Sequence, residues 1–212
     1  MCFSATASFT AAAGLAFAGV ATLGLKPAPR LIPYALTPLL FAAHQMIEGF
    51  VWLSVNETGT APPMLINAWV FIAKSFWPVW TPFMVLVLEG ESRRRIGLIT
   101  LLIVGAAISA LLLYVQLSTP FHVSVVDGNL RYASDHPLSD GVIGLYVLAT
   151  VAPMLISRHH YVALFGVAVL VGSATTELAY RHAGPSVWCF FAALASGLVF
   201  LHVREQSRAA RV

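Results

Sequence analysis

The sequence predicts an all-α protein, a bundle of seven transmembrane helices. The 212 residues are 58% hydrophobic and only 10% charged, whereas a soluble domain carries about 25% charged residues. Seven apolar runs have about the 20 residues needed to cross a bilayer core of about 30 Å. The basic residues lie in short segments between these runs, as in membrane proteins. This pattern argues against a nucleic-acid-binding surface, despite a pI near 9.1.

The expected helices form one membrane domain, residues 1–203, followed by a short basic tail, residues 204–212. They cover residues 5–25, 33–54, 64–88, 96–117, 139–157, 160–181 and 184–203. No basic residue precedes the first helix, which is therefore expected to be a retained span. The alternative, a cleaved signal peptide, would leave six spans.

The charge distribution predicts the orientation of the bundle. With the N-terminus outside, Arg131 and Arg181 are the only basic residues outside, and Lys74 lies within the third helix. The inner segments hold nine: Lys26, Arg30, Arg93, Arg94, Arg95, Arg158, Arg204, Arg208 and Arg211. Because basic segments stay in the cytoplasm, we expect the N-terminus outside and the C-terminus inside.

The third helix and the loop at residues 118–139 have distinctive local signals. Pro78 and Pro82 each remove a backbone donor, which frees the carbonyls of Lys74 and Pro78. Lipid cannot satisfy these carbonyls, so we expect a kink and a partner from another helix, a water or a ligand. In the external loop, β-prone runs around Asp127-Gly128 predict a β-hairpin, which is either a lid or a solvated ornament.

Four ionisable residues inside the apolar runs form the candidate site. His44 and Glu48 lie one turn apart on the second helix, Lys74 lies on the third and Glu177 on the sixth. Ionisable side chains at such depth usually mark a functional site. They could form an ion-pair network in which Lys74 pairs with Glu48 or Glu177. Alternatively, His44 and Glu48 could bind a divalent metal, or the residues could be unrelated.

Cysteine and tryptophan residues add further candidates. Cys2 could become the N-terminal nucleophile or a metal ligand after methionine removal. It could also form a disulfide with Cys189, or be a small apolar residue. Trp52 fits an outer aromatic belt. Trp77 lies deeper and could line an aromatic ligand pocket or simply pack in the core.

Several strings resemble an uncharacterised family of bacterial multi-pass membrane proteins that begin Met-Cys-Phe-Ser-Ala. They are Met1–Phe9, His44-Gln45, Glu48-Gly49, Trp52, Phe76–Pro82 and Ser186–Phe191. The resemblance implies location in the bacterial inner membrane and transfers no activity.

The sequence therefore predicts a bacterial membrane protein with an outward-facing polar pocket for a small ligand or a metal. A membrane-embedded, metal-dependent enzyme would use Glu48 or His44 as general base and Cys2 as nucleophile or ligand. The expected ligand-binding residues are Lys74, Glu177, Trp52 and Trp77. The alternatives are a proton-coupled small-molecule transporter, gated by a Lys74–Glu pair, and a sensor that depends on a partner.

Overall fold

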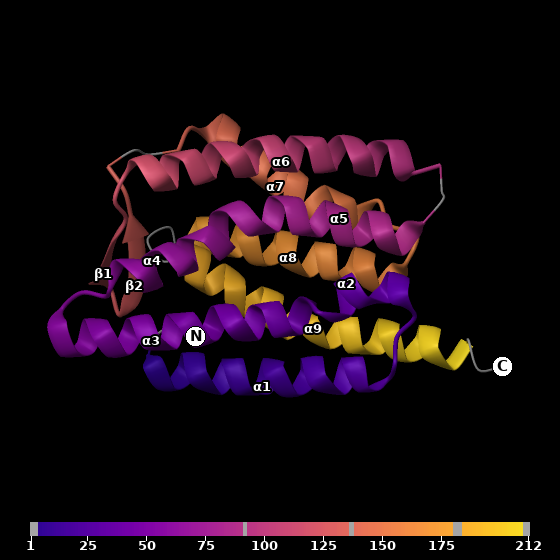
Figure 1. Ribbon diagram of the computed structural model, residues 1–212, viewed down its shortest axis with the longest axis horizontal. Helices are drawn as coiled ribbons and strands as arrows, with labels where there is room; N and C mark the ends of the chain where they lie inside the picture. The colour runs from indigo at the N-terminus through magenta and orange to yellow at the C-terminus, as the bar shows by residue number, and fades with distance from the viewer. Residues whose placement is uncertain (1–3, 91–92, 136–137, 180–183, 210–212) are drawn as a thin grey trace.

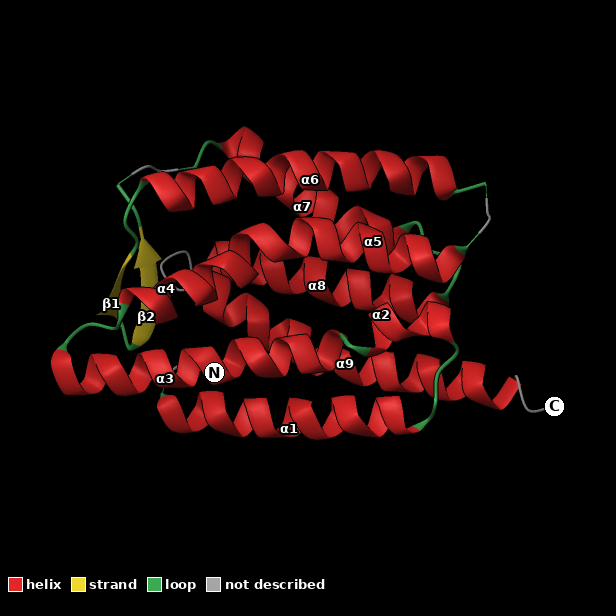
Figure 2. Ribbon diagram, in the orientation of Figure 1, coloured by secondary structure: helices red, strands yellow, loops and turns green. Residues whose placement is uncertain are grey.

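The computed structural model describes residues 4–90, 93–135, 138–179 and 184–209, and within them it leaves out the side chains of residues 175–194. Long helices lie roughly side by side in one bundle (Figure 1), and Figure 2 shows how little of the described chain is strand. The mainly helical fold class is confirmed. In chain order, the elements are α1 (Ala5–Gly24), the 3-10 helix η1 (Pro29–Leu31), α2 (Ile32–Ala35), α3 (Thr37–Thr58), α4 (Pro63–Val70), the π-helix η2 (Phe71–Phe76), α5 (Trp77–Glu89), α6 (Arg95–Ser118), β1 (His122–Val126), β2 (Asn129–Ala133), α7 (Asp140–Leu155), α8 (His160–Ala179) and α9 (Gly184–Ala209).

Three helical runs in the described residues are long and apolar enough to cross a membrane. They are Ala5–Gly24, Pro63–Glu89 and Arg95–Ser118. Asp140–Leu155 and His160–Ala174 are apolar but shorter. By length and composition, these helices are compatible with a membrane protein.

The second long helix begins and ends later than the predicted 33–54. A short α2 precedes a break at Leu36, and α3 then starts with Pro38 in its first turn. Proline is favoured there because the first turn needs no backbone donor. The helix continues to Gly59, which caps it in the left-handed conformation with φ of 77°. Glycine adopts this conformation readily, so it marks the helix end better than the hydropathy pattern does.

The predicted irregularity in the third helix is present and takes the form of a π-helix. α4, η2 and α5 follow one another without a gap, and Pro78 lies in the first turn of α5. A π-helix accommodates one extra residue per turn, and such segments bend helices. Because Pro78 has no N–H, an unbroken α-helical ladder could not pass through it.

Neighbouring helices supply donors to the carbonyls of this segment. The Tyr146 hydroxyl of α7 donates to the Ala73 carbonyl at 2.7 Å. The Ser109 hydroxyl of α6 donates to the Ser75 carbonyl. These donors reach Ala73 and Ser75, so a helix, water or ligand partner for the carbonyls of Lys74 and Pro78 stays a prediction.

The β-hairpin is present where Asp127-Gly128 predicted it. β1 and β2 pair antiparallel, with Val126 opposite Asn129. Asp127 and Gly128 both have positive φ, 49° and 74°, as a two-residue type I′ turn requires. Figure 1 shows the hairpin at one end of the bundle, together with the α3–α4 connection. We call this the hairpin end. The α5–α6 connection and the C-terminus lie at the other, C-terminal end.

Candidate functional site

A buried polar cluster lies on α3 in the half of the bundle nearer the hairpin. Its members are His44, Gln45 and Glu48, which are 1%, 3% and 0% exposed. The four-residue spacing puts His44 and Glu48 on one face of the helix, as predicted. We call these three residues the α3 polar cluster.

Aromatic rings connect this cluster to the hairpin. The Trp69 ring of α4 lies 4.9 Å from the His44 ring, centre to centre. The Trp69 ring also stacks on Tyr132 of β2, with the ring centres 3.7 Å apart and the planes only 3° apart. Trp52 is buried in the same hydrophobic cluster as Trp69. The hairpin therefore packs directly over the rings that cover His44.

Lys74 does not join the α3 polar cluster. Its ammonium lies 4.6 Å from the centre of the Phe121 ring, in the segment between α6 and β1. On the same helix, Asn67 accepts a hydrogen bond from Gln116 of α6 through its backbone carbonyl, at 2.8 Å. This face of the helix therefore points toward α6.

The expected ion pair between Lys74 and Glu48 is not formed. Ion pairs among the described side chains include Arg158–Glu89 and His160–Glu205, and neither involves Lys74. The Lys74 ammonium lies against the Phe121 ring instead, and Lys74 belongs to the π-helix, whose side chains do not follow α-helical spacing. Glu177 has no described side chain, so its pairing with Lys74 remains a prediction. Cys2 lies outside the described residues, and the side chain of Cys189 is not described either.

Trp77 lies away from the α3 polar cluster, in the middle of the bundle. It stacks on Phe41 of α3 at 4.5 Å. Both rings border a small cavity of about 10 Å³. The remaining lining residues are Thr37, Thr81, Met84, Thr150, Met154, Phe165 and Val169. A space of this size accommodates about one water molecule, which favours a packing role for Trp77 over a place in a ligand pocket.

The described residues do not assemble a metal centre. Among them, no group of three or more His, Cys, Asp and Glu side chains could hold a metal ion. His44 and Glu48 supply two candidate ligands. A metal bound there would need further ligands from residues whose side chains the structure does not describe.

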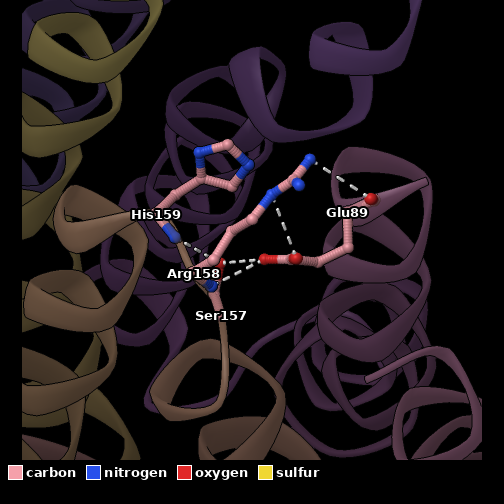
Figure 3. A network of polar contacts seen from close by, with 4 residues as sticks. All are labelled: Glu89, Ser157, Arg158 and His159. Atoms are coloured by element: carbon pink, nitrogen blue, oxygen red, sulfur yellow. Dashed lines mark hydrogen bonds and ion pairs between the residues drawn. The ribbon is translucent and has the colours of Figure 1, made fainter. Parts of the chain in front are cut away.

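A second polar site, which the sequence reasoning missed, lies at the C-terminal end. The Glu89 carboxylate, buried at the end of α5, accepts hydrogen bonds from the Ser157 hydroxyl at 2.7 Å and the Arg158 backbone N–H at 2.8 Å (Figure 3). The Arg158 guanidinium lies 3.4 Å from the other carboxylate oxygen. The His159 backbone N–H donates to the Ser157 hydroxyl at 3.2 Å. This Glu89 network ties the end of α5 to the segment that begins α8.

Beside the network, three buried or half-buried rings meet. The His202 ring of α9 lies 4.9 Å from the His159 ring and 5.6 Å from the Tyr34 ring, centre to centre. Both nitrogens of His202, Nε2 of His159 and the Tyr34 hydroxyl lack hydrogen-bond partners in the described structure. Burial lowers the pKa of His159. The negative charge of Glu89 opposes this effect, and the positive charges of Arg158 and Arg30 add to it.

The family of unknown function DUF6629 matches residues 1–212. The chain belongs to this family. The resemblance to a family without known activity is thereby confirmed over the whole chain. No curated protein and no solved structure matches it. The candidate functional residues of this DUF6629 protein lie in the two polar sites.

The sequence contains a partial indication of the Glu89 network. Glu89 is an acidic residue at the end of an apolar run, and Ser157-Arg158 lies between two others. We interpreted Arg158 only as a cytoplasmic charge. The contact between Glu89 and Ser157 joins positions 68 residues apart, and no helical periodicity predicts such a pairing.

Proposed function

We propose that this DUF6629 protein is an integral protein of the bacterial inner membrane that crosses the bilayer seven times, with its N-terminus outside. Three helices of spanning length support membrane insertion. Long helices run between the hairpin end and the C-terminal end in alternation (Figure 1), which fits repeated crossing. The basic residues of the connections between α1 and α2, α5 and α6, and α7 and α8 would then all face the cytoplasm.

We further propose that the α3 polar cluster binds a small polar ligand that enters from outside, beneath the hairpin. The observation that carries this proposal is the burial of His44, Gln45 and Glu48, together with the Trp69 ring beside His44 and the Tyr132 ring stacked on Trp69. Burying polar groups in an apolar bundle is costly, and such residues usually serve a function. The hairpin is the lid in this arrangement, because its Tyr132 ring must move before Trp69 and His44 are uncovered.

The chemistry of the cluster suits recognition by hydrogen bonds. Gln45 offers both donor and acceptor atoms, His44 offers one of each when neutral, and Glu48 accepts when ionised. In an enzyme, Glu48 or His44 would be the general base. Lys74 faces α6, so it does not supply the cation of this site. A gate built from a Lys74–Glu48 pair therefore has less support than ligand binding.

Metal analysis and intact mass measurement of the purified protein test this proposal. We expect a metal or a small molecule that copurifies with the wild type and is lost in both His44→Asn and Glu48→Gln. Glu57→Gln, an exposed change on the same helix, is the matched control and should retain it. If His44→Asn and Glu48→Gln retain the bound metal or small molecule, the binding site lies elsewhere. The exposed His122 of the hairpin would then be a candidate. If the purified wild-type protein contains no metal and added divalent metals do not raise its thermal stability, metal binding at this site is ruled out.

A further inference from the structure

We propose that the bundle contains a gated proton pathway along the buried face of α2 and α3, with the Phe41–Trp77 ring pair as its gate. The proposal rests on the seven-span arrangement proposed above. It adds an activity, the movement of protons down their gradient, that ligand binding at the α3 polar cluster does not require.

Buried side chains on this face follow the order polar, apolar, polar. Tyr34 of α2 and Phe41, His44 and Glu48 of α3 are all buried. Within α3, spacings of three and four residues keep Phe41, His44 and Glu48 near one helix face. At 1.5 Å per residue, Phe41 and Glu48 lie about 10 Å apart along α3, and Tyr34 precedes the break at Leu36. Titratable groups thus lie at both ends of the face, and the phenyl ring lies between them.

At the C-terminal end, the polar groups continue to the surface. Tyr34 contacts His202, and His202 contacts His159. His159 in turn adjoins the Glu89 network through Ser157, and the Arg158 side chain there is 51% exposed. The charges that act on the two imidazoles come from Glu89, Arg158, Arg30 and His160.

The hydrogen-bonding state of this end suits proton transfer. Both nitrogens of His202, Nε2 of His159 and the Tyr34 hydroxyl have no partner in the described structure. Buried polar atoms are rarely left in this state. They offer acceptors for a proton or for water molecules that enter when the pathway opens. Only N–H and O–H bonds form and break, so the step needs no other reactant.

The middle layer is closely packed. Phe41 and Trp77 stack at 4.5 Å beside the cavity of about 10 Å³. The Thr81 hydroxyl donates to backbone carbonyls, and so does that of Thr150. Their protons are therefore not available to water in the cavity. Apolar cavities of such size stay empty, and hydrophobic constrictions close pores by excluding water.

The gate lies where the third helix can bend. Trp77 is the first residue after the π-helix, and Pro78 and Pro82 follow it. Proline and π-helical segments are the usual hinges of long helices. Bending here would separate Trp77 from Phe41, which belongs to another helix, and would let water join the two polar regions.

The test is proton flux into liposomes. Purified protein is reconstituted with a pH-sensitive dye inside, and a potassium gradient with valinomycin drives protons. We expect slow flux in the wild type and a rise of about tenfold or more in Phe41→Ala, because a gate residue limits the rate. The matched control is Phe17→Ala, a lipid-facing phenylalanine that is 78% exposed, and it should leave the flux unchanged.

Further variants separate a pathway from a leak. In the Phe41→Ala background, Glu48→Gln combined with His44→Asn should return the flux to the wild-type rate, and so should His202→Asn. If Phe41→Ala fails to insert, Phe41→Leu keeps an apolar side chain without the ring stack and should raise the flux in the same direction. If Phe41→Ala or Phe41→Leu inserts into the liposomes and its proton flux equals that of the wild type, the proposal is overturned. So would a raised flux that persists without these titratable groups, since that would be a general leak.

This outcome is independent of the ligand measurement. A gate variant with raised, His44- and Glu48-dependent flux would support the pathway even if no metal or small molecule copurifies. Conversely, if His44→Asn loses the ligand but Phe41→Ala shows no raised proton flux, the proposed binding site is supported and the proposed proton pathway is refuted.

Discussion

At the residue scale, Glu89 and Arg158 contribute unequally to stability, although they form one ion pair. The Glu89 side chain is 0% exposed and that of Arg158 is 51% exposed. Half-exposed pairs contribute about 0–1 kcal/mol. Removing the carboxylate also leaves the Ser157 hydroxyl and the Arg158 N–H without their acceptor. We expect Glu89→Ala to lower the free energy of unfolding by about 2–4 kcal/mol and Arg158→Ala by at most about 1 kcal/mol. Unfolding in mixed micelles measures both, and equal losses would contradict the ranking.

His159 makes stability depend on pH at the same site. Burial lowers its pKa from the ordinary value, which is about 6.5. The unfolded chain then takes up the proton more readily, so stability falls as the pH falls through about 6.5 and below. His159→Gln should reduce the loss of stability between pH 7.5 and pH 5.5, measured by thermal unfolding. The exposed His122→Gln is the matched control, and an identical effect of the two substitutions would rule out this role for His159.

At the element scale, hydropathy predicted where the helices lie but not how they face one another. The apolar runs and the Asp127-Gly128 turn are local signals, and both reappear in the structure. The expected pairing of Lys74 with Glu48 or Glu177 rested on their similar depths, but the order of the helices in the bundle, which no local signal gives, decides which side chains meet. The two prolines predicted a disturbance but not its direction, because that depends on the α6 and α7 donors that meet the helix.

Close packing of α6 against α5 can be tested at one glycine. A Cβ atom at Gly105 would overlap the backbone carbonyl of Pro78. The overlap involves backbone rather than a flexible side chain, so the helices must separate. We expect Gly105→Ala to destabilise the bundle by about 1–3 kcal/mol. A Cβ at Gly14 of α1 meets nothing within 4 Å. Gly14→Ala should therefore be neutral or stabilising by up to about 1 kcal/mol. Equal thermal unfolding temperatures for the two variants would mean that α5 and α6 are not this close.

At the scale of the whole molecule, two polar regions lie at opposite ends of an apolar core. The α3 polar cluster adjoins the hairpin, and the Glu89 network lies near the C-terminus. The layer between them contains Phe41, Trp77 and Met84, all buried in one hydrophobic cluster. The first region could be predicted from the sequence because ionisable residues interrupt apolar runs there. The second could not, because its members lie at helix ends, where charged residues are ordinary.

The orientation of this arrangement in the membrane gives the last prediction. Nine basic residues belong to the segments that would face the cytoplasm and two to those that would face outward, and basic residues resist transfer across the inner membrane. A reporter that is active only in the cytoplasm should therefore be active when fused after Val212. One that is active only outside should be active when inserted near Gly128, at the exposed turn of the hairpin. Since an even number of spans would place both termini on one side, a third fusion before α1 checks the parity. Activity of the Val212 fusion outside, or of the Gly128 insertion in the cytoplasm, would refute the seven-span orientation. The α3 polar cluster would then face the cytoplasm and could not bind a ligand from outside.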